Sequence, residues 1–144
     1  MIWLLRHGDA AEGSPDAERQ LTDKGRAQSR AAGAALKALG VEIDACLTSP
    51  TLRAVDTARI ACEQLGDVEP RLEPKLAGGP FDAEALADGV GDDVLLVGHD
   101  PDFSAAVHSL TGAQVRMKKG GLAGVERGEL MVLLRPRELK RISG

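Results

Sequence analysis

The sequence predicts an α/β fold, a three-layer αβα sandwich around a mostly parallel sheet. Two short apolar runs, at residues 1–5 and 94–97, are typical of strands buried on both faces of a parallel sheet. Segments with apolar residues at helical spacing alternate with the expected strands, and this alternation favours the layered architecture. With 144 residues the chain has the length of one domain, so we expect residues 1–144 to form a single domain.

The first third of the chain predicts a strand, a loop, a helix and a second strand. The run MIWLL at residues 1–5 is the first strand, and a polar loop follows over residues 9–20. Thr22 is placed to cap a helix in which alanines recur every three or four residues, and Gly40 supplies its left-handed stop. Residues 41–47 (VEIDACL) alternate enough in polarity to form the second strand.

The middle of the chain predicts a second helix followed by short elements. Residues 48–51 (TSPT) precede a helix whose stripe of Leu, Val, Cys and Ala extends to Gly66. Residues 68–72 are expected to form an edge strand before Pro74. Residues 82–88 are expected to form a short helix.

The last third predicts one fully apolar strand and a less regular end. The strand is VLLV at residues 94–97, and Pro101 suits the first position of the next helix. The glycines within residues 120–128 neither follow a strand nor open a helix as a nucleotide-binding motif would, so they predict a turn. Residues 130–134 form the last expected strand, and residues 135–141 a solvated polar tail.

Composition excludes several classes of protein. The 18 Lys and Arg residues against 22 Asp and Glu give a net charge of −4, and only three residues are aromatic, so a nucleic-acid binder is not expected. No apolar run has the length of a membrane span and no basic leader precedes the first strand, which predicts a soluble, cytoplasmic protein without a membrane segment. Cys46 and Cys62 lack metal-site spacing and are expected to be buried thiols.

Arginines and histidines gather at the carboxyl ends of the expected strands, where open α/β sheets form their sites. The first strand leads into Arg6 and His7, the second into Arg53 in the first turn of its helix, and the strand at residues 94–97 into His99. Guanidinium groups bind the peripheral oxygens of a phosphoryl group, and a neutral imidazole can attack phosphorus. Repulsion from the arginines would keep one imidazole neutral. The set predicts phosphoryl transfer that needs no metal or other cofactor.

Three motifs, in order along the chain, resemble those of the histidine phosphatase superfamily, which has the phosphoglycerate mutase-like fold. Leu5–Gly8 is similar to its RHG signature, residues 48–54 followed by Thr57-Ala58 to its second block, and Val97–Asp100 to its third. The resemblance implies that His7 is a nucleophile that becomes transiently phosphorylated. It also implies that three side chains bind the phosphoryl oxygens, namely Arg6, Arg53 and His99.

The sequence RHGDA and the short chain are most similar to the SixA-type phosphohistidine phosphatases of that superfamily. This similarity implies a substrate protein that carries phosphohistidine, such as a phosphotransfer domain of a bacterial signalling or sugar-transport relay. Larger members use a catalytic Glu in a mid-chain insertion, but Glu69, Glu73 and Glu84 match no such motif. A P–N bond expels imidazole more easily than an ester expels an alkoxide. Because little chain is left for a lid, we expect a shallow, open site for another protein's side chain.

Several residues near these motifs allow two interpretations each. Asp9, two residues past His7, is the best candidate proton donor, or else a residue that caps its own loop. Ser49 is suited to cap the following helix and also to orient His7 from behind. Lys118 and Lys119 would either attract an acidic phosphoprotein or form a solvated loop.

Three other functions stay open at this point. A phosphatase of small phosphate esters would use the same residues. A metal-dependent hydrolase would use His7, Asp9, His99, Asp100 and Asp102 as ligands, although the two adjacent arginines would repel a cation. A module that binds phosphate or phosphohistidine without catalysis would have no need of the nucleophile.

Overall fold

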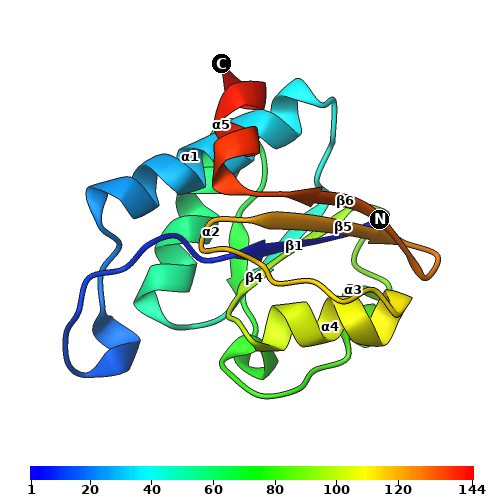
Figure 1. Cartoon of the computed structure of the whole chain (residues 1–144), viewed down its shortest axis with the longest axis horizontal. Coiled ribbons are helices and arrows are strands. Elements are labelled where there is room, and N and C mark those ends of the chain that lie inside the picture. Colours follow the sequence, from blue (N-terminus) through cyan, green and yellow to red (C-terminus); the bar gives the residue numbers. More distant parts are fainter.

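A computed structural model describes residues 1–144 and contains a six-stranded sheet between two layers of helices (Figure 1). The strand order is β3-β2-β4-β1-β5-β6. Four strands are parallel to one another: β1 (Ile2–Arg6), β2 (Ala45–Thr48), β3 (Pro70–Leu72) and β4 (Val94–Gly98). An antiparallel hairpin completes the sheet: β5 (Leu122–Glu126) and β6 (Glu129–Leu134). The predicted α/β fold with a mostly parallel sheet is therefore confirmed.

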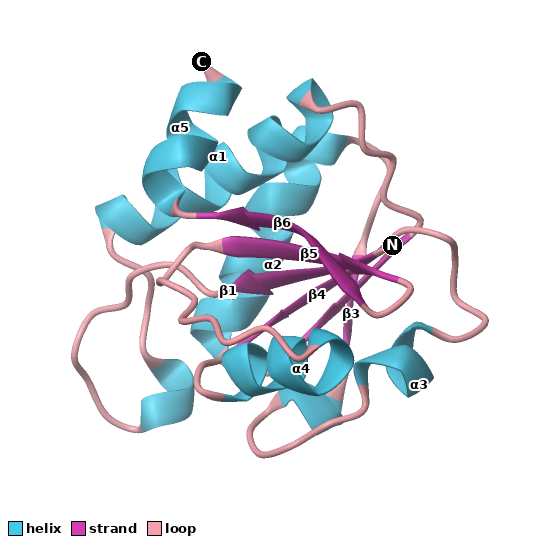
Figure 2. Cartoon of the chain, turned by 45° about the vertical axis from the view of Figure 1, so that its right-hand side comes forward, coloured by secondary structure: helices cyan, strands magenta, loops and turns pink.

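Helices cover both faces of this sheet (Figure 2). One face carries α1 (Asp23–Ala38), α2 (Leu52–Leu65) and α5 (Pro136–Ser143). The other carries α3 (Ala83–Ala87) and α4 (Asp102–Thr111). Two 3-10 turns lie in the connections: η1 (Asp16–Glu18) and η2 (Pro74–Leu76). None of the helices combines the length and the apolar character that crossing a bilayer requires.

Alternation along β1 divides the core between the two faces. Trp3 and Leu5 belong to the cluster beneath α1 and α2, whereas Leu4 belongs to the cluster beneath α4, together with Phe103. Successive side chains of a strand point to opposite faces, so a central strand covered by helices on both sides must be apolar throughout. The continuous apolar run that predicts β1 reflects this double burial.

The layer formed by α1 and α2 is closely packed because small residues face each other. A Cβ atom on Gly33 of α1 would lie 2.3 Å from the carbonyl oxygen of Ala61 in α2, so the two backbones are in direct contact there. Thr22 caps α1 as predicted, its hydroxyl accepting the backbone N–H of Gly25. This cap fixes the start of α1 next to the end of β1.

Two predictions about the end of the chain are wrong. The glycine-rich segment at residues 120–128 is not a turn throughout, because most of it forms β5; Gly124 is required there, since a Cβ atom would lie 2.9 Å from the Trp3 ring. The polar tail at residues 135–141 forms most of α5, which buries Leu139 completely and packs on α1. The polar residues of α5 occupy one face of the helix and the apolar residues the other. Composition alone does not reveal this separation.

Smaller differences concern the ends of elements. The second strand covers residues 45–48 rather than 41–47, and the last begins at Glu129 rather than at residue 130. Pro101 immediately precedes α4 instead of being its first residue. None of these differences moves a site residue away from the sheet edge.

Candidate active site

The carboxyl ends of β1 and β4 bring the two predicted histidines together. Because β1 and β4 are parallel neighbours with Arg6 opposite Gly98, the next residue on each strand, His7 and His99, leaves the sheet at the same edge. Their ring centroids are 5.2 Å apart with a 60° angle between the planes. Both residues are buried, with 7% and 8% of their surface exposed.

The His7 ring has a defined tautomer. Its Nδ1 atom lies 2.7 Å from the carbonyl oxygen of Gly8. A carbonyl only accepts, so Nδ1 carries the proton and donates it, and Nε2 of the neutral ring keeps a free lone pair. Burial lowers the pKa of His7 to about 4, with smaller contributions from His99, Arg53 and Arg6. The predicted repulsion from arginines is present, but burial is the main reason that the imidazole is neutral.

The two predicted arginines each leave one buried N–H group unpaired. Arg6 Nη1 donates to the carbonyl oxygen of Met117 at 2.8 Å, while its Nε is buried and has no partner. Arg53, in the first turn of α2, also has a buried Nε without a partner. Buried guanidinium N–H groups are costly to leave unpaired, so these two donors indicate a site for an anion.

Hydroxyl groups hold the ring of His99 from behind. The Nε2 atom lies 2.8 Å from Ser49 Oγ and 3.3 Å from Thr51 Oγ1. Ser49 therefore supports His99 and not His7, and the N-cap residue of α2 is Thr51 rather than Ser49. Burial lowers the pKa of His99, with a further contribution from Arg53.

Asp9 contacts groups other than the two histidines. Its carboxylate accepts the Thr22 hydroxyl at 2.8 Å and lies 3.6 Å from Lys119 Nζ. Its backbone N–H donates to Gln28 Oε1 at 2.9 Å. These contacts correspond to the loop-capping interpretation of Asp9, because they fix the loop after His7 against the start of α1.

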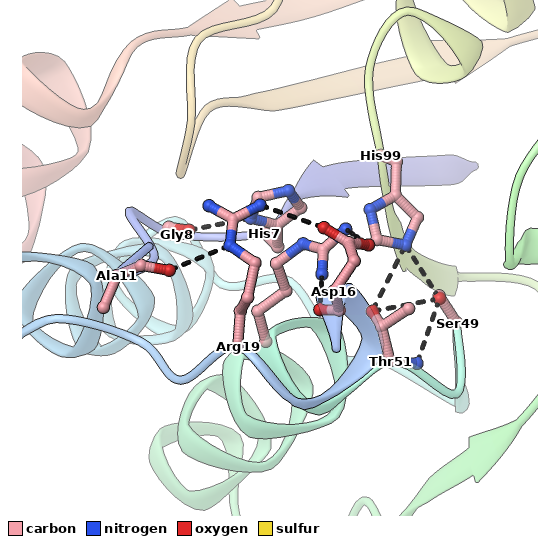
Figure 3. Close-up of polar contacts among 9 residues, drawn as sticks. His7, Gly8, Ala11, Asp16, Arg19, Ser49, Thr51 and His99 are labelled. Carbon is pink, nitrogen blue, oxygen red and sulfur yellow. Dashed lines mark hydrogen bonds and ion pairs between the residues drawn. The ribbon is translucent and has the colours of Figure 1, made fainter. Parts of the chain in front are cut away.

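Sequence reasoning missed two residues of the loop over residues 9–20, Asp16 and Arg19 (Figure 3). The Asp16 carboxylate lies 3.1 Å from Arg53 Nη2 and 3.2 Å from Arg19 Nη1, and its carbonyl oxygen accepts from Arg53 Nη1 at 2.9 Å. Arg19 Nε in turn donates to the carbonyl of Ala11. Hydrogen bonds from Arg19 and Arg53 lower the pKa of Asp16. The loop therefore covers part of the site, which the expectation of an open site did not include.

Thr57 of α2 is another functional side chain that sequence reasoning left without a role. Its hydroxyl accepts the backbone N–H of Gly8 at 3.1 Å and donates to the carbonyl of Arg53 at 2.8 Å. One buried hydroxyl thus connects the loop that carries His7 with the helix that carries Arg53. The signals in the sequence are its position one turn after Arg53 and its place in Thr57-Ala58, which follows the second family motif.

The carboxylates that a metal-dependent hydrolase would need have other partners. Asp100 accepts the N–H and hydroxyl of Ser104, and Asp102 accepts the N–H of Gly79 at 3.1 Å. No group of three or more His, Cys, Asp or Glu side chains is placed to hold a metal ion. The donor geometry does not favour that alternative.

Comparison with known proteins agrees with this geometry. The model of the histidine phosphatase superfamily (branch 1) matches residues 2–81, which is more than half of the chain. The chain belongs to the histidine phosphatase superfamily. The matched region contains β1, the loop over residues 9–20, and α2, and thus three of the four predicted site residues, namely Arg6, His7 and Arg53.

Matches to individual relatives cover most of the length of this histidine phosphatase superfamily member. It is 36% identical to the phosphohistidine phosphatase SixA of Escherichia coli (strain K12) over 112 residues, which cover 69% of this chain and 67% of that protein. It is 35% identical to an uncharacterized protein of Picosynechococcus over 143 residues, covering 88% and 85% of the two chains. A solved structure of the protein histidine phosphatase SixA complexed with tungstate superposes with a TM-score of 0.82 at 26% identity, covering 96% and 99%.

Proposed function

We propose that this protein is a phosphohistidine phosphatase that forms a covalent phosphohistidine intermediate on His7. One observation carries the proposal: the free lone pair of His7 Nε2 lies in a buried site with two unpaired guanidinium N–H groups, those of Arg6 and Arg53. A nucleophile beside unpaired cationic donors is the arrangement that transfer of a phosphoryl group requires.

In the first step, Nε2 of His7 attacks phosphorus and the P–N bond to the substrate imidazole breaks. Arg6 and Arg53 hold the peripheral oxygens, and their charge stabilises the transition state. We assign the Ser49 hydroxyl, 2.8 Å from Nε2 of His99, as the donor in this contact, which leaves the Nδ1–H group of His99 free for a third contact with the phosphoryl group. The leaving imidazolate takes a proton from water, and the hydroxide that remains is neutralised by the proton that the attacking water releases in the second step.

In the second step, water attacks the phosphorus of phospho-His7 and the P–Nε2 bond breaks. Inorganic phosphate leaves and the imidazole returns to its neutral form. No carboxylic acid is needed for either step, because imidazole is a good leaving group. Asp16, the carboxylate nearest to Arg53, is kept ionised by its two arginine partners and is therefore a poor proton donor.

The substrate that we propose is phosphohistidine on another protein, such as a phosphotransfer domain of a bacterial signalling or sugar-transport relay. The likeness to SixA of Escherichia coli over two thirds of both chains supports this choice over small phosphate esters. With such a substrate, we propose a role in signal transduction in the cytoplasm. Breaking a P–N bond needs no positioned acid, because imidazole is a good leaving group, whereas expelling an alkoxide from a P–O bond does. A site without such an acid therefore favours phosphohistidine as the substrate.

Rapid-quench labelling tests the proposal. The wild-type protein is mixed with a phosphotransfer domain that carries radiolabelled phosphohistidine, and label on the enzyme is followed over time. We expect transient label that is stable in base and labile in acid. His7→Ala should abolish both the label and turnover, whereas the control His108→Ala, an exposed residue of α4, should leave both unchanged.

Three results would contradict the proposal, two through the mechanism and one through the substrate. Full turnover in the His7→Ala protein would exclude His7 as the nucleophile. Loss of activity with EDTA and recovery with zinc or manganese would instead indicate a metal-dependent hydrolase. Faster turnover of sugar phosphates than of phosphohistidine would transfer the assignment to a phosphatase of small esters.

A further inference from the structure

Helices α1 and α5 are neighbours in the structure (Figure 1). A groove between them is lined by several positively charged side chains. Its volume is about 480 Å³, and alanines of α1 form part of its floor. No Asp or Glu lines it, although the chain has a net charge of −4. Its lining includes four exposed basic side chains, namely Lys24, Arg30, Arg137 and Lys140.

These cations have little compensation within the protein. Of the four, Arg137 alone lies within ion-pair distance of a carboxylate, with its Nε 3.7 Å from Glu138. The hollow on the opposite flank, between α2 and β3, has a volume of about 700 Å³ and mixed charge, since Arg59, Glu63 and Glu69 line it. The lining of the α1–α5 groove therefore holds four cations and no Asp or Glu side chain, unlike the lining of the hollow between α2 and β3.

The end of the groove beside the start of α1, called its mouth below, adjoins the loop that follows His7. Gln28 lines the groove and accepts the backbone N–H of Asp9 at 2.9 Å. Gly120 lies so close to Gln28 that a Cβ atom on the glycine would be 2.8 Å from the glutamine Cβ. The N–H of Gly120 donates to the carbonyl of His7 at 3.0 Å. Gln28 and Gly120 thus connect this end of the groove directly with the loop that carries His7.

Two more exposed lysines extend the positive surface from the groove toward the site, Lys118 and Lys119. They precede β5, whose first residue, Leu122, lies opposite Leu5 at the end of β1. Lys119 also lies 3.6 Å from Asp9, two residues past the nucleophile. Exposed cations therefore lie both in the groove and in the segment before β5 that adjoins the end of β1.

We propose that the groove between α1 and α5 is the docking site for an acidic surface of the substrate phosphoprotein. The inference rests on the proposed function and adds the side from which the partner approaches. Charge complementarity at a rim raises the association rate and orients the partner before contact. Carboxylates of the partner would meet Lys24 and Arg137 first, since each lies in the first turn of its helix at the site end of the groove.

An acidic protein fits this surface better than a nucleic acid does. Single-stranded nucleic acids need aromatic platforms for their bases. Here Trp3 and Phe103 are buried in the core, and the partly buried Phe81 packs against Phe103 beneath α4, so no aromatic side chain lines the groove. The remaining surface is acidic on balance and would repel an extended polyanion.

Charge-reversal variants test the docking site. K24E/R137E reverses two cations at the mouth of the groove, and the control R71E/K75E reverses two exposed cations on the β3 flank with the same change in net charge. The kcat/KM of each protein is measured on an acidic phosphotransfer domain that carries phosphohistidine and on free phosphohistidine. We expect K24E/R137E to lower kcat/KM on the domain by about tenfold at low ionic strength, with a weaker salt dependence than the wild type.

The two substrates separate the docking site from the chemistry. K24E/R137E should hydrolyse free phosphohistidine at the wild-type rate, and R71E/K75E should match the wild type on both substrates. Equal rates of K24E/R137E and wild type on the domain would overturn the docking site alone. A wild-type protein inactive on both substrates would refute the proposed function and this inference with it. Binding of a single-stranded oligonucleotide at physiological salt that K24E/R137E abolishes would assign the groove to nucleic acid and overturn the proposal.

Discussion

Lowering the pH should destabilise the folded protein through His7, because the folded state resists protonation of this ring. Burial holds the pKa of His7 at about 4, against 6.5 for an exposed histidine. Between these two values the unfolded chain binds a proton at this position and the folded protein does not, so the free energy of unfolding falls as the pH falls. Above about pH 6.5 both states are neutral and His7 contributes no pH dependence.

The size of the effect follows from the two pKa values. At about 1.4 kcal/mol per pKa unit, the full loss by about pH 4 is about 3 kcal/mol, and the loss by about pH 5 is about 2 kcal/mol. Urea unfolding at about pH 7.5 and about pH 5, at constant ionic strength, measures it. His7→Gln removes the titration while keeping a polar side chain of similar size beside the Gly8 carbonyl.

Two comparisons make the measurement specific. The wild-type protein should lose about 2 kcal/mol more than His7→Gln between these two pH values. Burial also lowers the pKa of His99, so both proteins retain that pH dependence and the difference between them reports His7. The exposed control His108→Gln should behave like the wild type. Equal losses in wild type and His7→Gln would refute the argument that the folded site keeps His7 neutral by burial.

Three further substitutions test contacts of the site. Thr57→Val leaves the buried N–H of Gly8 unpaired and should cost about 1–3 kcal/mol of unfolding free energy in urea, with Thr57→Ser restoring most of it; an unchanged midpoint would contradict the role of the hydroxyl. Gly8→Ala places a Cβ atom 2.5 Å from the Gly25 carbonyl oxygen and should also cost about 1–3 kcal/mol, so wild-type stability would disprove the close contact. Asp16→Ala frees Arg53 and should tighten inhibition by inorganic phosphate about two- to fivefold; weaker inhibition would show that the carboxylate positions the guanidinium.

The sequence predicts the centre of the fold well because local patterns are strongest there. The run that forms β1 must be apolar on both faces, so it is recognisable without knowledge of its neighbours. The same strand ends carry Arg6, His7 and His99, and parallel pairing alone brings them together. The arrangement of the predicted residues therefore follows from topology.

The contacts that sequence reasoning missed depend on partners distant in the chain. Gly124 suits a strand only because the Trp3 ring lies over it, and no pattern around residue 124 indicates this. Asp16 lies in a polar loop whose composition suggests solvent, yet it meets Arg53, 37 residues away. Such long-range contacts between single side chains have no periodicity from which they could be predicted.

The direct backbone contact between Gly33 and Ala61 constrains how this protein can change over time. Any side chain at Gly33 would push α1 away from α2 and disturb the helix whose start supports the loop that follows His7. The helical layer is therefore a fixed frame with little tolerance for substitution. New substrates can be accommodated by the loop over residues 9–20 and by the exposed residues of α5, where replacement does not alter that frame.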